Sequence, residues 1–164
     1  MCGIVGAIAR RNVVPILMEG LKRLEYRGYD SAGIAIRDSS AHLQRIRSVG
    51  KVSCLQEMLD ETEISGVLGI AHTRWATHGE PNDINSHPHI SDSGLFCVVH
   101  NGIIENYQEI RNNLNLKNYE LSSETDTEVI AHLLARELQK AQTICDATRS
   151  AIRRLVGAYA LAVI

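Results

Sequence analysis

Short strand-like runs alternate with amphipathic helical stretches along the whole chain, and this alternation restricts the possible folds more than any other sequence feature. A short apolar run, or an apolar–polar alternation over a few residues, predicts a strand. The predicted strands span residues 2–9, 34–37, 43–48, 67–73, 95–100 and 158–164. Both faces of the first strand look buried. Periodicity alone indicates a mixed α/β class, and the alternation would favour a parallel sheet.

Several helix starts carry residues that can cap free backbone N–H groups. The capping residues are Asn12, Thr125 with Glu128, and Thr143 with Asp146. The pair Thr125 and Glu128 has the spacing of a capping box, in which each side chain bonds the other residue's backbone N–H. The helices that follow these caps are predicted over 13–26, 128–138 and 144–155, with two more around 52–59 and over 106–114.

Composition limits the classes of partner. The 164 residues carry a formal net charge of −2 at a pI near 6.4, so nothing indicates binding to nucleic acid or to an anionic membrane. A chain of this length can form one domain with its own core. Because no apolar run approaches the ~18 residues of a membrane-spanning helix and no signal-peptide pattern is visible, we expect a cytoplasmic protein.

Cys2 directly follows Met1 and is one of four widely spaced cysteines, which we expect to be free thiols. Removal of Met1 would place a thiol and an α-amino group on the same residue. The thiolate is a strong nucleophile, and an amine with a pKa of about 7.7 to 8.0 can take its proton near neutral pH. Cys2 could therefore supply both nucleophile and base. The simpler interpretation is a small, buried residue that opens a strand.

Three further stretches place unusual residues where predicted strands or loops end. Residues 74–79 open a long loop that reaches about position 94, and loops of that length in compact domains are usually functional or disordered. The pair Asn101-Gly102 predicts a sharp turn that breaks the preceding strand. Residues 123–126 lead into the strongest predicted helix. Loop positions of this kind are typical of binding and catalytic side chains.

Five motifs, in order, resemble those of the class II glutamine amidotransferases, which are N-terminal nucleophile hydrolases. They are CGIVG at 2–6, LEYRGYDSAG at 24–33, HTRWATHG at 72–79, HNG at 100–102 and ETD at 124–126. Residues 26–33 and 123–132 are most similar to the glutaminase domain of the glucosamine-6-phosphate synthase family. The resemblance implies an α+β fold over residues 1–164: a four-layer αββα sandwich with two antiparallel sheets between helical layers. It also implies a domain that continues beyond Ile164 and is therefore truncated here, with the sugar isomerase domains absent.

The resemblance assigns roles to five residues. In the family, the cysteine that corresponds to Cys2 attacks the side-chain amide of L-glutamine, forms a thioester and releases ammonia, after which water frees glutamate. Asn101, through its side chain, and Gly102, through its backbone N–H, would stabilise the developing oxyanion. Arg74 would bind the α-carboxylate of glutamine as a planar fork of donors, and Asp126 would bind the α-ammonium.

Four more substrate-binding candidates follow from the same resemblance. Thr77 and His78 would add contacts to glutamine, and Trp75 would close over the site and help to gate ammonia. Arg27 lies in a family motif near the nucleophile. No metal or cofactor is implied. A separate isomerase half would use the ammonia to convert fructose 6-phosphate to glucosamine 6-phosphate, and we expect the full-length enzyme to be a homo-oligomer.

Each candidate has a simpler explanation. Asp126 could be a first-turn acid favoured by the helix dipole, Arg74 a surface ion-pair partner, and Trp75 a core aromatic. The joint occurrence of the motifs favours a site. Three alternatives stay open: another class II amidotransferase of the phosphoribosylpyrophosphate-dependent or asparagine-forming type, a silent domain with Met1 retained, and a zinc site. The histidines that suggest zinc have no compact ligand spacing: His72, His78, His87, His89 and His100.

Overall fold

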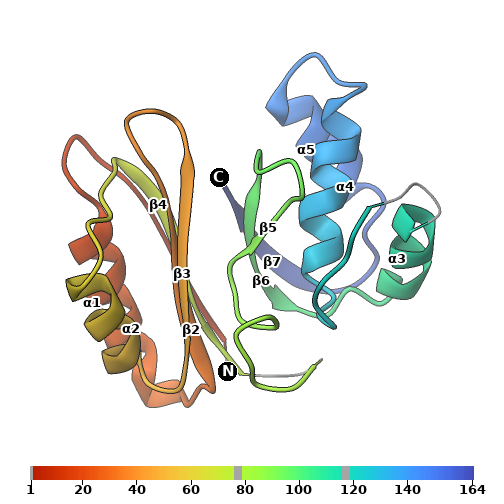
Figure 1. Cartoon of the computed structure of the whole chain (residues 1–164). Coiled ribbons are helices and arrows are strands. Elements are labelled where there is room, and N and C mark those ends of the chain that lie inside the picture. Colours follow the sequence, from red (N-terminus) through yellow and green to blue (C-terminus); the bar gives the residue numbers. More distant parts are fainter. Residues whose placement is uncertain (1, 76–78, 116–118) are drawn as a thin grey trace.

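Two antiparallel sheets face each other between layers of helices (Figure 1). The computed structural model describes residues 2–75, 79–115 and 119–164. The predicted four-layer αββα sandwich is confirmed, and the parallel sheet that alternation alone would favour is not formed. Every strand pairing in the described residues is antiparallel. In the four-stranded sheet, two strands that are joined through a helix are never neighbours, because another strand lies between them, so they form no parallel pair.

The first sheet has the strand order β1-β4-β2-β3. Its strands are β1 (Gly3–Ile8), β2 (Ser31–Arg37), β3 (Leu43–Val49) and β4 (Leu68–Arg74). The helices α1 (Val14–Leu24) and α2 (Val52–Asp60) cover its outer face, and a 3-10 helix, η1 (Glu25–Arg27), follows α1. The predicted hairpin between residues 34–37 and 43–48 is confirmed as β2 and β3, which pair in antiparallel register.

The second sheet has the order β5-β6-β7. Its strands are β5 (His89–Ile90), β6 (Cys97–Gly102) and β7 (Tyr159–Val163). The helices α3 (Tyr107–Asn115), α4 (Glu128–Leu138) and α5 (Ile144–Ile152) pack on its outer side (Figure 1). Nearly all of α4 is buried, because β5, β6, α3 and α5 all contact it. The single apolar stripe of the sequence therefore understates the burial of this helix.

Two sequence predictions about strands are wrong. Asn101 and Gly102 do not break the strand but continue β6, opposite Ala160 and Tyr159 of β7. The first strand is not buried on both faces: Ile8 is 80% exposed. β1 is an edge strand, and only its beginning packs between the sheets. Tertiary pairing decided both outcomes, because neither the partner of β6 nor the edge position of β1 is encoded locally.

The predicted cap at Thr143 is confirmed, whereas the N-cap positions of α1 and α4 are Val13 and Thr127, neither of which makes a side-chain capping bond. The hydroxyl of Thr143 accepts a hydrogen bond from the backbone N–H of Asp146 at 3.1 Å, as a capping residue should. Thr125 likewise accepts from the backbone N–H of Glu128 at 3.3 Å. The reciprocal half of that capping box is not made, because the Glu128 carboxylate accepts from Ser122 and Ser123 instead.

None of the helices in the described ranges has the length and apolar content needed to cross a membrane.

Candidate active site

A cavity of about 710 Å³ lies where β1, β4 and β6 come together and gathers most of the predicted site residues. Those that line it are Cys2, Arg27, Arg74, Trp75, Asn101, Gly102 and Asp126. The predicted residues Thr77 and His78 lie outside the described part of the chain. The cavity thus brings together residues from five different parts of the sequence.

Strand pairing places Cys2 beside the end of β4. Gly3 lies opposite Thr73 in the antiparallel ladder, so the residues just beyond this pair are neighbours. The backbone N–H of Trp75 donates a hydrogen bond to the Sγ of Cys2 at 3.1 Å, and the thiol lies 3.4 Å from the Trp75 carbonyl oxygen. A backbone N–H aimed at sulfur stabilises negative charge there. Cys2 is only partly buried, so its sulfur stays accessible to a ligand in the cavity.

Asn101 connects the end of β6 to Cys2. Its Nδ2 donates a hydrogen bond to the backbone carbonyl oxygen of Cys2 at 3.2 Å. On the opposite side, its Oδ1 lies 2.8 Å from the Nε2 of His72, a buried residue of β4. The Asn101 amide is therefore held between the two sheets, with its donor end toward Cys2.

Gly102 occupies a position that only glycine fits well. Its φ angle is +122°, a region that residues with a Cβ rarely adopt. A Cβ built at this position would also lie 2.2 Å from the carbonyl oxygen of Ala158, which is far inside contact distance. Glycine at this position therefore lets the end of β6 lie directly against the backbone at the start of β7.

Arg74 is a buried cation at the cavity wall and is only 3% exposed. Its Nη2 donates to the carbonyl oxygen of Gly79 at 3.1 Å, and its Nη1 lies 3.7 Å from Oδ1 of Asp30. A buried charge without such partners would cost several kcal/mol. The guanidinium is thus fixed in place, and the simpler interpretation of Arg74 as a surface ion-pair partner is wrong.

Asp126 is a buried carboxylate from the loop before α4 and is 4% exposed. One of its oxygens accepts a hydrogen bond from the backbone N–H of Ile104 at 2.9 Å. The other lies 3.7 Å from Nδ1 of His100. Because α4 begins at Glu128, Asp126 lies ahead of its first turn, and it lines the cavity together with Arg74. The cavity wall therefore carries fixed charges of both signs.

Glu128 anchors the loop that presents Asp126. Its carboxylate accepts hydrogen bonds from the backbone N–H and hydroxyl groups of Ser122 and Ser123, at 2.7 to 3.0 Å. Burial raises the pKa of Glu128, but the contact with His132 and the bonds from the two serines outweigh it and hold the pKa well below its ordinary value. Glu128 therefore stays ionised and keeps the loop in position.

Sequence reasoning did not assign four further residues to this cavity: His87, His100, Ile103 and Thr125. His87 and His100 had been considered only as metal ligands or packing residues. Both contact the hydroxyl of Thr127, at 2.7 and 3.0 Å, so they belong to a buried hydrogen-bond network. Burial lowers the pKa of His87 well below its ordinary value, so its ring is neutral. The HNG motif was a usable signal for His100; no comparable signal marks Ile103.

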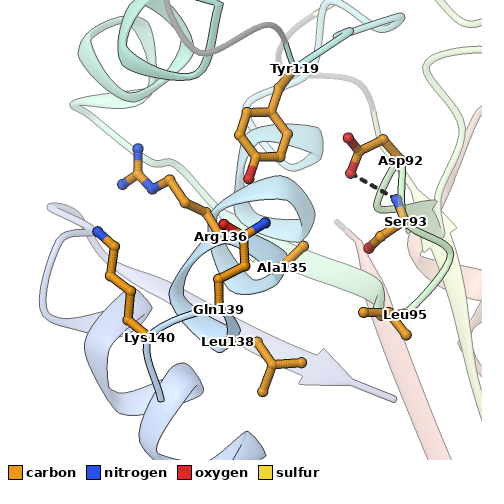
Figure 2. A pocket seen from close by; sticks show the side chains of 9 residues that line it. All are labelled: Asp92, Ser93, Leu95, Tyr119, Ala135, Arg136, Leu138, Gln139 and Lys140. Carbon is orange, nitrogen blue, oxygen red and sulfur yellow. Dashed lines mark hydrogen bonds between the residues drawn. The ribbon is translucent and has the colours of Figure 1, made fainter.

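The zinc alternative gains no support from the geometry. Within residues 2–75, 79–115 and 119–164, no three His, Cys, Asp or Glu side chains are grouped to hold a metal ion. A second cavity, of about 680 Å³, lies at the C-terminal end of α4 and contains none of the predicted site residues (Figure 2). Tyr119, Arg136 and Lys140 are among the side chains that surround it. Among the described residues, no cysteine lines it and none of the five family motifs reaches it, so the cavity at Cys2 is the candidate site.

Comparison with known families agrees with this site. A family model described as a glutamine amidotransferase domain matches residues 72–164, more than half of the chain. The chain therefore belongs to the glutamine amidotransferase domain family. Its fold and its N-terminal Cys-Gly motif are those of the class II, N-terminal nucleophile branch.

Curated relatives narrow the similarity. The chain is 57% identical to glutamine–fructose-6-phosphate aminotransferase (isomerizing) of Vibrio parahaemolyticus over 159 residues, which are 97% of this chain and 26% of that protein. The proteins of the same name from Pseudomonas aeruginosa and Escherichia coli K12 are 58% and 56% identical, covering 100% and 97% of this chain and 27% and 26% of theirs. The chain thus spans about a quarter of the length of these relatives.

Solved structures support the fold. Glutamine phosphoribosylpyrophosphate amidotransferase from B. subtilis superposes with a TM-score of 0.84 at 25% identity, covering 100% of this chain and 35% of that one. A structure described as the allosteric regulatory enzyme of purine biosynthesis gives a TM-score of 0.81 at 28% identity, covering 99% and 34%. The identity to both is about half of that to the curated relatives.

Proposed function

We propose that this chain is a glutaminase that hydrolyses the side-chain amide of L-glutamine to glutamate and ammonia. One observation carries the proposal: a single cavity is lined by a thiol, an amide donor, a buried guanidinium and a buried carboxylate. These groups belong to Cys2, Asn101, Arg74 and Asp126. An amino acid with a side-chain amide requires this combination, because it offers one electrophilic carbon and two charged ends.

The reaction begins once Met1 is removed and the α-amino group of Cys2 is free. The amine takes the thiol proton, Sγ bonds to the amide carbon, and the carbonyl electron pair moves onto oxygen. The Asn101 side chain and the Gly102 backbone N–H would stabilise this oxyanion, each donor contributing about 2.7 to 4 kcal/mol. When the intermediate collapses, the ammonium proton moves to the leaving nitrogen and ammonia departs, leaving a thioester.

Hydrolysis of the thioester completes the cycle. Water gives a proton to the α-amino group of Cys2 and attacks the acyl carbon. The C–S bond breaks, glutamate is released, and the proton returns to sulfur. No metal or cofactor enters any of these steps.

The ends of glutamine would be matched by charge. Arg74 would bind the α-carboxylate, since its planar fork suits two oxygens, and Asp126 would bind the α-ammonium. Further contacts from Arg27, Trp75, Thr77 and His78 are proposed from the family resemblance. Arg27 and Trp75 line the same cavity, which supports their part of the assignment.

We also propose that the domain serves a longer protein. The relatives are named for an aminotransferase that uses fructose 6-phosphate and glutamine, and this chain corresponds to about a quarter of their length. The ammonia would then pass to a separate isomerase half that converts fructose 6-phosphate to glucosamine 6-phosphate in a homo-oligomeric enzyme.

The four cysteines are all unpaired, which fits a reducing cytoplasm. Neither nucleic acid nor membrane is a proposed partner.

The test is a glutaminase assay on protein whose N-terminus has been defined by intact mass. Protein without Met1 should form glutamate from L-glutamine but not aspartate from L-asparagine, which is one methylene too short to reach both charged anchors. If Met1 is retained, aminopeptidase treatment should switch the activity on. Failure to form glutamate after confirmed removal of Met1 would make the proposal wrong. In the longer protein, formation of glucosamine 6-phosphate would exclude the asparagine-forming and phosphoribosylpyrophosphate-dependent alternatives.

A further inference from the structure

His72 is buried at the centre of the first sheet, behind the proposed oxyanion site. It lies in β4 opposite Ile4 of β1 and Gly33 of β2, so its backbone is held from both sides. Its side chain is fully buried. Ile70, two residues earlier, packs in the layer between the sheets, and alternation along the strand directs His72 to the same face. The position of the ring is therefore fixed by the sheet.

The hydrogen-bond partners of His72 determine which nitrogen carries its proton. Nε2 lies 3.1 Å from the backbone carbonyl oxygen of His100. A carbonyl oxygen can only accept, so Nε2 must be the protonated nitrogen of the ring. Burial lowers the pKa of His72 to about 4, which leaves Nδ1 without a proton at neutral pH. No described residue forms a hydrogen bond with Nδ1. The ring therefore makes its hydrogen bonds through Nε2 alone.

This tautomer fixes the orientation of the Asn101 amide. The same Nε2 lies 2.8 Å from the Asn101 side chain, and an N–H group can face an amide only at its oxygen. Oδ1 must therefore point toward His72 and Nδ2 away from it. At the other end, Nδ2 donates to the carbonyl oxygen of Cys2, again an obligate acceptor. A rotated amide would place N–H against N–H on one side and oxygen against oxygen on the other.

We propose that His72 is a positioning residue for glutamine hydrolysis: its Nε2–H fixes the Asn101 amide so that Nδ2 faces the oxyanion. This inference rests on the proposed function. His72 exchanges no proton and contacts no substrate in this role. A core histidine that merely fills space would have no such link to the rate of the chemical step.

Substitutions of His72 separate these two possibilities. His72→Leu removes the donor, and kcat for glutamine hydrolysis should fall at least ~10-fold, up to the ~100- to 1,000-fold of a deleted oxyanion donor, with little change in KM. His72→Gln offers an amide N–H at nearly the same reach and should restore most of kcat. The matched control is Ile70→Ala, which creates a packing defect on the same face of β4 without touching Asn101. It should lower Tm while leaving kcat within ~2-fold.

A double-mutant cycle tests whether His72 acts through Asn101. In an Asn101→Ala background, the amide is absent, so His72→Leu should cause no further loss of kcat. Equal losses in both backgrounds would overturn the inference, as would equal kcat values for His72→Leu and wild type.

Failure of the inference can be told apart from failure of the proposed function. If wild-type protein lacking Met1 does not form glutamate, the proposed function is wrong, and NMR then tests the positioning directly. The Asn101 side-chain N–H resonances should shift and exchange faster with solvent in His72→Leu than in wild type and His72→Gln. Unchanged resonances in His72→Leu would overturn the assignment of His72.

Discussion

The backbone N–H of Trp75 donates a hydrogen bond to the sulfur of Cys2 at 3.1 Å, although 73 positions separate the two residues. The antiparallel register of β1 and β4 creates this contact, because Gly3 pairs with Thr73 immediately beside it. Cys2 is thus held by sheet pairing and not by a local turn. A shift of one residue in that register would move Cys2 away from the cavity.

Cys2 should be the cysteine that an electrophilic glutamine analogue modifies. Its sulfur lines the cavity, whereas Cys97 is buried, and burial raises the pKa of the Cys97 thiol to about 12, so it stays protonated. Intact-mass analysis should show one adduct on protein without Met1, and Cys2→Ala should abolish it. The matched control is Cys145→Ser, an exposed cysteine on α5, which should leave labelling unchanged. Labelling that persists in Cys2→Ala would contradict the assignment.

Arg74→Lys should weaken glutamine binding. Lysine keeps the charge but loses the planar fork that can hold a carboxylate at two points, and such charge-assisted bonds are worth about 1.5 to 3 kcal/mol. We expect KM for glutamine to rise ~10- to 100-fold with a smaller change in kcat. Arg23→Lys is the control, because the Arg23–Glu19 pair is exposed on α1. An unchanged KM in Arg74→Lys would remove Arg74 from the substrate site.

Gly102→Ala should disable the site without unfolding the domain. The residue would have to adopt a φ of +122°, at a strain of about 1 to 3 kcal/mol, and its Cβ would push the Gly102 backbone away from the Ala158 carbonyl oxygen, which displaces the Gly102 N–H. We expect kcat to fall ~100-fold or more, as for the loss of an oxyanion donor. Gly6→Ala on β1, where an added Cβ meets nothing within 4 Å, should be nearly neutral. Circular dichroism should confirm that both variants are folded.

Glu128→Gln should destabilise the loop before α4. Glutamine replaces one acceptor oxygen with an NH₂ group that opposes the N–H groups of Ser122 or Ser123, at a cost of about 1.5 to 3 kcal/mol. Urea unfolding at pH 7 should show this loss, and Glu57→Gln on the exposed side of α2 should not. Because the pKa of Glu128 is lowered by folding, its stabilisation is present above about pH 4.5 and is lost below it. The variant should therefore lose less stability in acid than wild type does.

The buried histidines should lower the free energy of unfolding in mild acid, at pH values above those at which protonation of Glu128 has an effect. Burial lowers the pKa of His72 to about 4 and that of His89 to about 3, from an ordinary value of 6.5. Below pH 6.5 the unfolded chain binds protons that the native state does not, so the free energy of unfolding falls toward pH 4, by about 1.4 kcal/mol per pH unit per histidine. Urea unfolding at pH 7.5, 6 and 5 measures this slope.

Two variants complete that experiment. His89→Gln should flatten the dependence on pH between 6.5 and 5, because one buried titrating ring is removed. His42→Gln should leave it unchanged, since the His42 side chain is 81% exposed. Equal stability of the wild type at pH 7.5 and pH 5 would contradict the neutral state of the buried rings.

Local sequence information predicted most elements. Three predictions that depend on contacts within a few residues are confirmed. They are the helices α4 and α5 with their apolar stripes, the hairpin of β2 and β3, and the cap at Thr143. The short strand β5 was missed because His89 and Ile90 form too brief a pattern to be seen in a long loop. Asn101-Gly102 was assigned to a turn because the pairing with β7 that holds it extended is more than 50 positions away.

The sequence by itself identified Cys2 as the candidate nucleophile, the family motifs and most of the places where strands and helices form, since these depend on residue identity and short-range periodicity. Only the tertiary structure decided which strands pair, that Asp126 is buried in the cavity wall, and that His72 faces Asn101. The physical reason is that strand partners, desolvation and side-chain tautomers are set by neighbours distant in sequence. The residue type and position of Cys2 indicate its chemistry, whereas the packing of the two sheets supplies the groups that surround its thiol.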